Sequence, residues 1–473
     1  MIFNSIHFLE FILIFIPLYY FFKGKLRLWF TLGASYFFYG YWDYRFLALV
    51  LVSTIFEYNL ALYLEKTEDE KKRKRLLITS IVFNLVTLGF FKYFNFFIES
   101  TNSVLGLFGT GTIHNTLNII LPIGISFYTF QAISYTTDIY KRKIKAETDF
   151  AAFSVYSIFF AKLTAGPILR AHDFLPQLKT DQKFSWDNFE TGLSRVLLGF
   201  AKKIIIADSL GSFVGTAFAY PEKYSSLYLI IGIIFYSFQI YCDFSGYSDI
   251  AIGIARILGY RFPENFNFPY LAKNFSEFWS RWHMSLSSWL REYLYIPLGG
   301  NRNGKFNAYR NLMITMLLGG LWHGANWTFV VWGGLNGVYL VVQRLILPTT
   351  DKIAKVMPKQ LFIPSAMIIV FLLTCFSRIF FRSNDFDSSF EMIKGIFAFN
   401  DMSFGHLPNK FVIIKNIGLV SILMALEYIH QSNNFEELVL KSPTFKIIAF
   451  SVILWMIALF GTFSDSQFIY IQF

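Results

Sequence analysis

Two histidines stand in aromatic, apolar sequence and are the side chains best suited to proton-transfer chemistry. His283 lies in "SRWHMSLS" and His323 lies in "GGLWHGANW". Desolvation disfavours the charged form of an imidazole, so a buried histidine stays neutral and can accept a proton as a general base. The alternative for His323 is a packing histidine that hydrogen-bonds a neighbouring helix, and the alternative for His283 is a side chain that faces lipid headgroups.

Carboxylates also occur in an apolar run, and a buried carboxylate needs a partner. The stretch "FQIYCDFSGYSDIA" contains Asp243 and Asp249. Arg256 and Arg281 are the candidate cations. We favour a structural ion pair that fixes helix packing over a substrate contact made by Asp243 or Arg281.

Two basic features lie near these segments. The Lys202/Lys203 pair in "GFAKKIIIAD" is predicted to be an interface anchor whose ammonium groups snorkel towards headgroups. The glycine-rich loop "YIPLGGNRNGK" (Tyr295–Lys305) could cradle a phosphate-bearing donor through backbone N–H groups and Arg302, or could be a plain connection.

Several familiar catalytic signatures do not occur in the sequence. There is no HExxH, CxxC, GxxxxGK[ST], GxSxG or dinucleotide-binding fingerprint. The two cysteines, Cys242 and Cys375, fall in separate apolar segments, which favours neither a disulfide nor a metal site. We therefore expect no bound metal or cofactor.

The elements that position these residues must be membrane helices. Of the 473 residues 55% are hydrophobic and only 15% are charged, whereas a soluble domain carries about 25% charged residues. Apolar runs near the ~20 residues that cross a bilayer recur along the chain. The net charge of +11 indicates basic loops facing anionic headgroups better than it indicates nucleic acid.

The sequence thus predicts an all-α, polytopic membrane protein of roughly 11 or more helices. No internal repeat, low-complexity tract or soluble domain interrupts it, so residues 1–473 are expected to form one membrane-embedded domain. Representative predicted spans are Phe46–Leu64, Leu76–Ile98, Tyr224–Cys242, Leu361–Phe380 and Phe445–Phe463.

Basic loops alternate along the first part of the chain. "KGKLR" (Lys23–Arg27), Glu65–Arg75 and Lys141–Lys145 are rich in Lys and Arg, whereas Asp43–Arg45 and Glu99–Thr116 are poor in them. The positive-inside rule places the basic loops in the cytoplasm and the N-terminus outside. The first apolar stretch lacks a basic n-region and a cleavage site, which indicates a retained span.

Two segments do not fit a simple span. Phe150–Ala165 is apolar but short and has basic residues on both sides, which predicts a re-entrant segment buried in protein. Phe275–Leu298 repeats aromatic and aliphatic residues near helical spacing with charges between them, which predicts an amphipathic interfacial helix.

Taken together, the motifs resemble the membrane-bound O-acyltransferase family, and in particular its bacterial branch that acetylates exported polysaccharides such as alginate. The resemblance rests on motifs spread over most of the chain, of which the central block is the most specific. They are "LPIGISFYTFQAISYTTDIY" (121–140), "AGPILRAHDFLPQL" (165–178), the block from "QIYCDFSGYSDIA" to "LYIPLGGNR" (239–302), "GGLWHGANWTFVVWGGLNG" (319–337) and the terminal "FIYIQF".

The resemblance implies that His323 is the family's membrane histidine and that His283 occupies its second polar position. It further implies a central tunnel that both side chains reach, with a cytoplasmic thioester donor such as acetyl-CoA. The acceptor would be a polysaccharide or a secreted or periplasmic partner that carries the acyl group onward. Related subunits transfer D-alanine to teichoic acid, so the acyl group stays open.

Acyl transfer from a thioester to a hydroxyl suits these residues. His323 would accept the hydroxyl proton, His283 would position the substrate or share the proton, and Asn326, one helical turn beyond His323, could donate to the oxyanion. A polysaccharide transporter and a non-catalytic scaffold are the competing readings. A transporter predicts internal repeats and paired broken helices, which the sequence does not contain.

Overall fold

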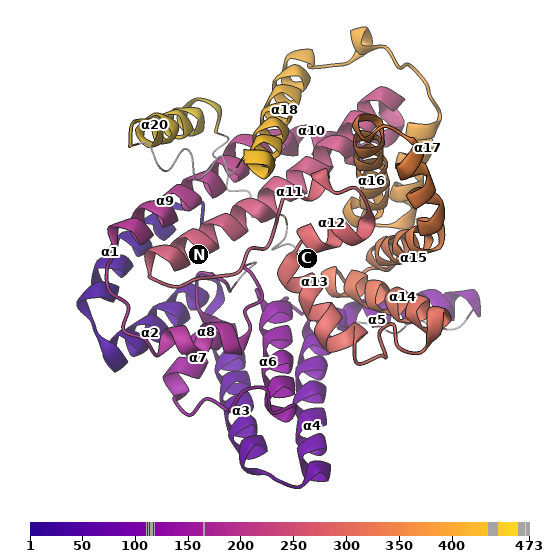
Figure 1. The fold of residues 1–473 in the computed structure, drawn as a ribbon. Helices are drawn as coiled ribbons and strands as arrows, with labels where there is room; N and C mark the ends of the chain where they lie inside the picture. Colours follow the sequence, from indigo (N-terminus) through magenta and orange to yellow (C-terminus); the bar gives the residue numbers. More distant parts are fainter. Residues whose placement is uncertain are drawn as a thin grey trace. The chain divides into compact units, whose positions relative to one another are not determined.

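All regular secondary structure in the described part of the chain is helical. The computed structural model describes residues 1–109, 111, 113, 117, 119–163, 166–433, 443–461 and 469. Within these residues the regular structure consists of α-helices, short 3-10 turns and π-helical segments, with no strand (Figure 1). This confirms the all-α prediction.

Two compact units make up the described chain. The first comprises Met1–Leu193 and Ala251–Pro263, and the second comprises Ser194–Ile250 and Glu264–Phe473. Helices α9 (Trp186–Phe200) and α11 (Ser226–Ile257) each begin in one unit and end in the other. The other helices of the first unit are α1 (Ile6–Phe21), α2 (Gly24–Asp43), α3 (Leu47–Lys66), α4 (Glu70–Leu88), α5 (Phe94–Leu107), α6 (Ile125–Tyr140), α7 (Phe150–Ile158) and α8 (Ala171–Leu178).

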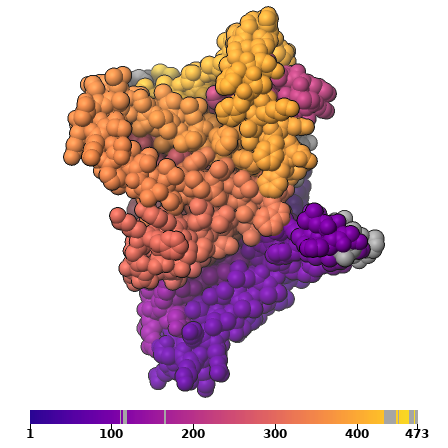
Figure 2. All heavy atoms as spheres, turned by 90° about the vertical axis from the view of Figure 1, so that its right-hand side faces the viewer, coloured from indigo at the N-terminus to yellow at the C-terminus, as the bar shows by residue number. Residues whose placement is uncertain are grey.

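The second unit contains the segments that carry both candidate histidines. Its helices are α10 (Asp208–Ala219), α12 (Phe275–Arg281), α13 (Met284–Leu290), α14 (Gly304–His323), α15 (Trp327–Val356), α16 (Lys359–Arg382), α17 (Phe386–Phe397), α18 (Lys410–Asn433) and α20 (Pro443–Phe460). π-helical segments η2 (Gly89–Tyr93), η3 (Ala201–Ala207) and η6 (Arg291–Tyr295) interrupt or extend the α-helices. In the space-filling view, α14 to α17 form a continuous salmon-to-orange surface (Figure 2).

Six helical stretches of the described chain are long and apolar enough to cross a bilayer, which agrees with a polytopic membrane protein. Three of the predicted spans fall within them, Tyr224–Cys242 begins two residues before the stretch that contains the rest of it, and the fifth span overlaps the shorter apolar helix α20. The stretches are Gly24–Lys66, Glu70–Leu107, Ser226–Ile257, Trp327–Val356, Lys359–Arg382 and Lys410–Gln431.

Helices α3, α4 and α6 pack together in the first unit around a buried carboxylate (Figure 1). Glu57 accepts hydrogen bonds from Ser80, Asn84 and Thr136, so one acidic side chain joins the three helices. Arg73 joins two of the basic loops at one end of the unit, because its Nη2 atom donates to the carbonyl oxygens of Ile139 and Tyr140, each at 3.0 Å.

The predicted re-entrant segment contains a helix that is too short to cross a bilayer. Helix α7 has 9 residues, and the described residues between it and α8 (159–163 and 166–170) are non-helical. Phe159, Phe160 and Ala161 in this non-helical stretch are fully buried, and the hydroxyl of Tyr156 donates to the carbonyl oxygen of Leu169 at 3.5 Å. Non-helical backbone of this kind is tolerated at membrane depth only where protein covers it.

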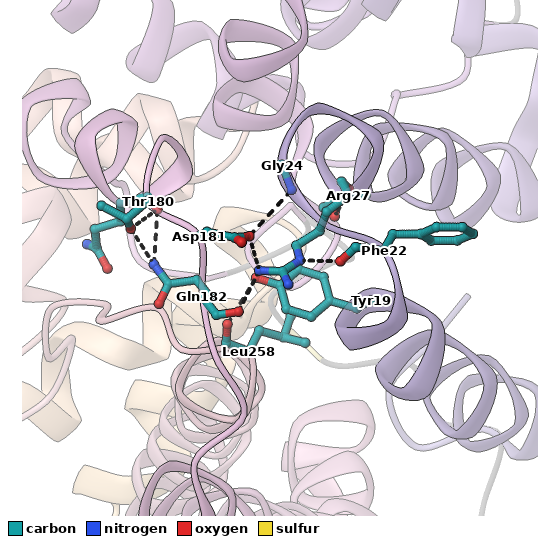
Figure 3. Close-up of polar contacts among 10 residues, drawn as sticks. Tyr19, Phe22, Gly24, Arg27, Thr180, Asp181, Gln182 and Leu258 are labelled. Atoms are coloured by element: carbon teal, nitrogen blue, oxygen red, sulfur yellow. Dashed lines mark hydrogen bonds and ion pairs between the residues drawn. The ribbon is translucent and has the colours of Figure 1, made fainter.

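A buried arginine clasps three segments of the first unit, as Figure 3 shows. Arg27 donates from Nε to the carbonyl oxygen of Phe22 at 2.9 Å and from Nη1 to that of Gln182 at 2.6 Å. The same Nη1 lies 3.0 Å from Asp181 Oδ1, and the guanidinium lies 4.9 Å from the ring centre of Tyr19. Tyr19 in turn donates to the carbonyl oxygen of Leu258 at 3.0 Å, which ties the α1–α2 turn to the end of α11. We call these residues the Arg27 clasp.

Glycines bring α14 and α15 into close contact in the second unit. A Cβ atom on Gly320 would lie 2.3 Å from the carbonyl oxygen of Phe329, and one on Gly333 would lie 2.3 Å from that of Met316. Such distances are closer than van der Waals contact, so only glycine fits at these two positions. This close approach fixes α14, and with it His323, against α15.

Candidate active site

The predicted amphipathic helix is broken at His283, which is a correction to the sequence analysis. Instead of one helix over Phe275–Leu298, the chain forms α12, an interruption at Trp282 and His283, then α13 and η6. His283 has φ 44° and ψ 54°, in the left-handed region that side chains other than glycine seldom adopt. Such a conformation costs on the order of 1–3 kcal/mol and persists only where the surroundings impose it.

Asn265 imposes this geometry through both its backbone and its side chain. Its carbonyl oxygen accepts from the N–H of Met284 at 2.9 Å, so the start of α13 is fixed. Its side-chain Oδ1 accepts from the N–H of Ser285 at 3.2 Å and lies 3.1 Å from Nδ1 of His283. Asn265 and His283 are both fully buried. Sequence reasoning missed Asn265, because an asparagine in "PENFNFPYL" carries no distinctive signal.

These contacts determine the tautomer of His283. A backbone N–H can only donate, so the Asn265 atom that faces Ser285 must be the amide oxygen. The Nδ1 atom of His283 therefore donates to that oxygen, and Nε2 carries the lone pair. Burial lowers the pKa of His283, which lies outside the candidate spans, to about 3, so the ring is neutral at physiological pH.

His323 is the last residue of α14 and is also buried, with 5% of its surface exposed. Its ring centre lies 5.0 Å from that of Trp332 and 5.4 Å from that of Phe381. Gly324 follows directly, and a Cβ there would lie 2.2 Å from the ring of Phe329, so a larger residue would have to displace this ring.

The two histidines meet although 40 residues separate them in the chain. Their ring centres lie 6.4 Å apart, and Trp322 contacts both rings. His323 also lines a small pocket within the second unit. The pocket is lined by His323, Ile240, Phe278, Trp282, Trp332, Asn336, Thr374, Ser377, Arg378 and Phe381.

Arg378 is a pocket residue that the sequence analysis missed. It lies in α16 and is 4% exposed. The available signal was an arginine within the apolar run "LLTCFSRIFF", since an ionisable side chain inside a predicted span is a functional hypothesis by default.

The other predicted site residues lie in different surroundings. Asn326 is the N-cap of α15: its side chain accepts from the N–H of Thr328 at 2.9 Å and donates to the carbonyl oxygen of Asn384 at 2.6 Å. Because α14 ends at His323, Asn326 is not one helical turn beyond it, which corrects that expectation. Arg302 is exposed on the glycine-rich loop, and its N–H donates to the carbonyl oxygen of Gly299 at 3.1 Å.

The buried carboxylates have partners other than the arginines predicted for them. Lys203 Nζ lies 2.8 Å from Asp243 Oδ1 and 2.8 Å from Asp208 Oδ1. Asp249 pairs with Lys202 and Arg195. Arg281 instead pairs with Glu277 at 2.7 Å, and Arg256 pairs with Asp187 at 3.5 Å.

The predicted interface anchor is therefore wrong, because Lys203 is 1% exposed and Lys202 is also paired. The π-helical segment η3 carries both lysines, and each reaches a different carboxylate of α11. Asp243 also accepts from the N–H of Ile469 at 2.8 Å. Ile469 is the one described residue of the terminal motif "FIYIQF", whose other residues lie outside the described part of the chain, as does Ala165 at the start of the second motif.

Comparisons with known proteins match the part of the chain that contains these residues. The family model of the membrane-bound O-acyltransferases matches residues 37–382, which include both histidines and Arg378. The chain is 40% identical over 427 residues to a probable alginate O-acetylase AlgI of Azotobacter vinelandii, covering 90% of this chain and 83% of that relative.

Two further relatives differ in what their names describe. A peptidoglycan O-acetyltransferase of Helicobacter pylori is 35% identical over 457 residues, covering 90% of this chain and 82% of the relative. A teichoic acid D-alanyltransferase of Bacillus subtilis is 27% identical over 291 residues, covering 58% of this chain and 71% of the relative. The similarity to the two acetyl-transferring relatives is thus higher and extends over more of the chain.

Proposed function

Because the chain belongs to the membrane-bound O-acyltransferase family, and is therefore an acyltransferase, we propose that it transfers an acetyl group to a hydroxyl of an exported polysaccharide. The names of the more similar relatives support acetyl and polysaccharide over D-alanyl and teichoic acid. The single observation that carries the proposal is the meeting of two buried histidines, 6.4 Å apart between ring centres, with His323 lining a pocket.

His323 is the general base in this proposal. It accepts the proton of the acceptor hydroxyl as the hydroxyl oxygen attacks the carbonyl carbon of the acyl thioester. The tetrahedral adduct then collapses, the C–S bond breaks, and the leaving thiolate takes the proton from His323. The aromatic lining excludes water, which would otherwise hydrolyse the thioester.

His283 positions the substrate or shares this proton. Its Nδ1–H is held by Asn265, so the lone pair on Nε2 has a fixed direction. A base whose ring is oriented by a third polar group is the arrangement that nucleophilic acyl-transfer sites share. The strained backbone at His283 gives the ring this orientation.

The donor and acceptor belong to this proposal as well. We propose that acetyl-CoA or another acyl thioester approaches from the cytoplasmic side, and that Arg302 and the glycine-rich loop help to gather its anionic part. The acceptor is the polysaccharide itself or a secreted or periplasmic acetyltransferase that passes the group onward. The tunnel joining the two sides, and a single membrane-embedded domain over residues 1–473, are further parts of the proposal.

The proposed location is the inner membrane of a bacterial cell, with the N-terminus outside. The contact of Arg73 with the end of α6 supports a common side for the loops Glu65–Arg75 and Lys141–Lys145. A cysteine placed at the exposed Lys72 should resist an impermeant thiol reagent in intact cells and react after lysis. Rapid labelling in intact cells would reverse the proposed orientation. Both native cysteines are buried, so the background should be low.

Replacing His323 tests the catalytic role. His323→Ala should insert and fold normally but transfer acetyl about 10²–10⁴-fold more slowly, because a general base contributes that much. His283→Ala should also impair transfer. His406→Ala is the matched control, since this histidine is largely exposed and pairs with Asp401. Acetylation near the wild-type rate in His323→Ala would favour a non-catalytic scaffold instead.

A further inference from the structure

Arg378 brings a positive charge to the pocket of His323, and no carboxylate in the described part of the chain pairs with it. The side chain is 4% exposed and lies in a candidate membrane span. Among the described residues, no Asp or Glu oxygen lies within 4.0 Å of its guanidinium, whereas Arg27 and Arg195 each have such a partner. An arginine is effectively always charged, so a buried guanidinium of this kind indicates that negative charge arrives with the substrate or develops in the reaction.

Its contacts hold the guanidinium in place and leave donors available. Nη1 donates to the carbonyl oxygen of Ser237 at 2.9 Å and to the hydroxyl of Tyr270. The guanidinium carbon lies 4.5 Å from the ring centre of Trp282, the residue next to His283. Both hydrogen bonds use the same nitrogen, so Nε and Nη2 remain able to donate to a ligand in the pocket.

The other polar side chains of the pocket donate to their own helices. The hydroxyl of Thr374 donates to the carbonyl oxygen of Val370 at 2.7 Å, and that of Ser377 donates to Thr374 at 2.9 Å. The amide of Asn336 donates to the carbonyl oxygen of Trp332 at 2.8 Å. Arg378 is therefore the pocket residue with the greatest remaining donor capacity.

Arg378 and His323 line the same pocket, to which Phe381 also contributes. Phe381 lies three residues later on α16, so the two side chains share one face of that helix. The ring of Phe381 contacts that of His323, and all three residues line the pocket.

We propose that Arg378 is a catalytic residue that stabilises the oxyanion of the tetrahedral adduct; this inference rests on the proposed function. When the acceptor oxygen attacks, the carbonyl π electrons move to the carbonyl oxygen, and Nε or Nη2 donates to it. The hydroxyl proton passes to His323 in the same step. When the C–S bond breaks, the charge leaves the oxygen, and the thiolate takes the proton. A preformed cation in an aromatic pocket suits a charge that exists only between these two steps.

This assignment takes the role that the sequence analysis gave to Asn326. The amide of Asn326 donates to Asn384 and its oxygen caps α15, so the side chain is already engaged at the start of that helix. A permanent anion, such as a carboxylate of the acceptor sugar, is the competing ligand for Arg378. The two differ because an oxyanion forms only in the reaction, whereas a carboxylate is bound before it.

Steady-state kinetics with purified enzyme, acetyl-CoA and an oligosaccharide acceptor separate these ligands. Arg378→Met should lower kcat about 10²–10³-fold, as loss of one oxyanion donor does, with both KM values within about twofold of wild type. Arg378→Lys should be intermediate, because it keeps the charge but loses the planar fork. Lys359→Met is the control, since this cation is exposed at the start of the same helix and lies outside the pocket lining, and it should retain nearly wild-type kcat.

The opposite results would overturn the inference. A raised acceptor KM with unchanged kcat in Arg378→Met would assign the guanidinium to a bound carboxylate. If Arg378→Met does not fold, Arg378→Lys decides alone: reduced kcat at unchanged KM supports the oxyanion role, and wild-type kcat contradicts it. Failure of the proposed function would look different, since the wild-type enzyme would then transfer acetyl to no polysaccharide whatever residue stands at position 378.

Discussion

Two buried arginines, one in each unit, show how differently this chain treats the same side chain. Arg27 is 7% exposed and Arg378 is 4% exposed, and each stacks near aromatic rings and donates to backbone carbonyl oxygens. Arg27 also has the carboxylate of Asp181 at 3.0 Å, whereas no described carboxylate accompanies Arg378.

From this difference we infer that Arg27 stabilises the fold, whereas Arg378 binds a negative charge of the substrate or of the reaction. The donors of the Arg27 clasp are directed at parts of the first unit, so its contribution is to stability (Figure 3). The hydrogen bonds of Arg378 use one nitrogen, so Nε and Nη2 remain able to donate to a ligand. Burial alone would not distinguish the two, because both are almost fully covered.

Lys203 belongs with Arg27 in this comparison, and its replacement should have the largest effect on stability. Lys203→Met leaves the buried carboxylates Asp208 and Asp243 without their shared cation. Removing one partner of a buried ion pair typically costs about 3–5 kcal/mol, so the midpoint of thermal unfolding in detergent should fall sharply.

A double variant tests whether Asp243 has a second role in substrate binding. Lys203→Met with Asp243→Asn should recover part of the lost stability, because one unpaired charge disappears. If Asp243 is purely structural, the folded double variant should keep the wild-type KM values. A raised acceptor KM would restore the substrate-binding role for Asp243. Lys352→Met, at an exposed position, is the control and should unfold like wild type.

Arg27→Met should destabilise the first unit by a smaller amount and leave the chemistry intact. The substitution removes charge-assisted hydrogen bonds worth about 1.5–3 kcal/mol each, but Asp181 is half exposed and can be hydrated. We expect a lower unfolding midpoint with unchanged kcat at a permissive temperature. Lys25→Met, two residues away and exposed, is the control. A kcat loss as large as that of Arg378→Met would remove the distinction between the two arginines.

Asn265→Ala should reduce activity although Asn265 takes no direct part in the reaction. The side chain that orients Nδ1 of His283 is lost, and small misplacements of catalytic groups cost up to about 10²-fold, so we expect kcat to fall roughly 10–100-fold. Both KM values should change little. Asn267→Ala, an exposed neighbour, should behave like wild type. Wild-type kcat in Asn265→Ala would show that the orientation of His283 does not matter for transfer.

The sequence pattern predicted the features that follow from local composition, namely the long helices and the candidate histidines. It missed the features that follow from contacts between residues far apart in the chain. Apolar length predicted the long helices, and the setting of His283 and His323 singled them out. The break at His283 was missed because Trp282, Leu286 and Trp289 keep helical spacing across it, while the cause of the break is Asn265, 18 residues earlier.

The partners of charged residues were missed for a related reason. Asp243 was matched with Arg256 or Arg281, which follow it in the chain, but its cation Lys203 lies 40 residues before it on η3. Two successive lysines look like an interface anchor, and only the packing of η3 against α11 turns both into buried partners. Arg378 could have been noted from its apolar run, but whether a carboxylate lies beside it depends on the fold, and none of the described carboxylates does.

Arg302→Ala should produce the smallest change of these substitutions. Arg302 is exposed, whereas Arg27 and Arg378 are buried. Arg302 is exposed on a loop whose Gly299 and Gly300 have φ values of 112° and 55°. If this loop gathers an anionic donor, one lost cation should raise the donor KM about fivefold, corresponding to ~1 kcal/mol, with kcat nearly unchanged. The increase should shrink at high salt, because exposed charges are screened.

Lys355→Ala is the control, since that lysine is exposed at the end of α15. A donor titration that gives the wild-type KM for Arg302→Ala would reduce the loop to a connection, whereas a lower kcat at unchanged KM would place Arg302 beside the reacting groups.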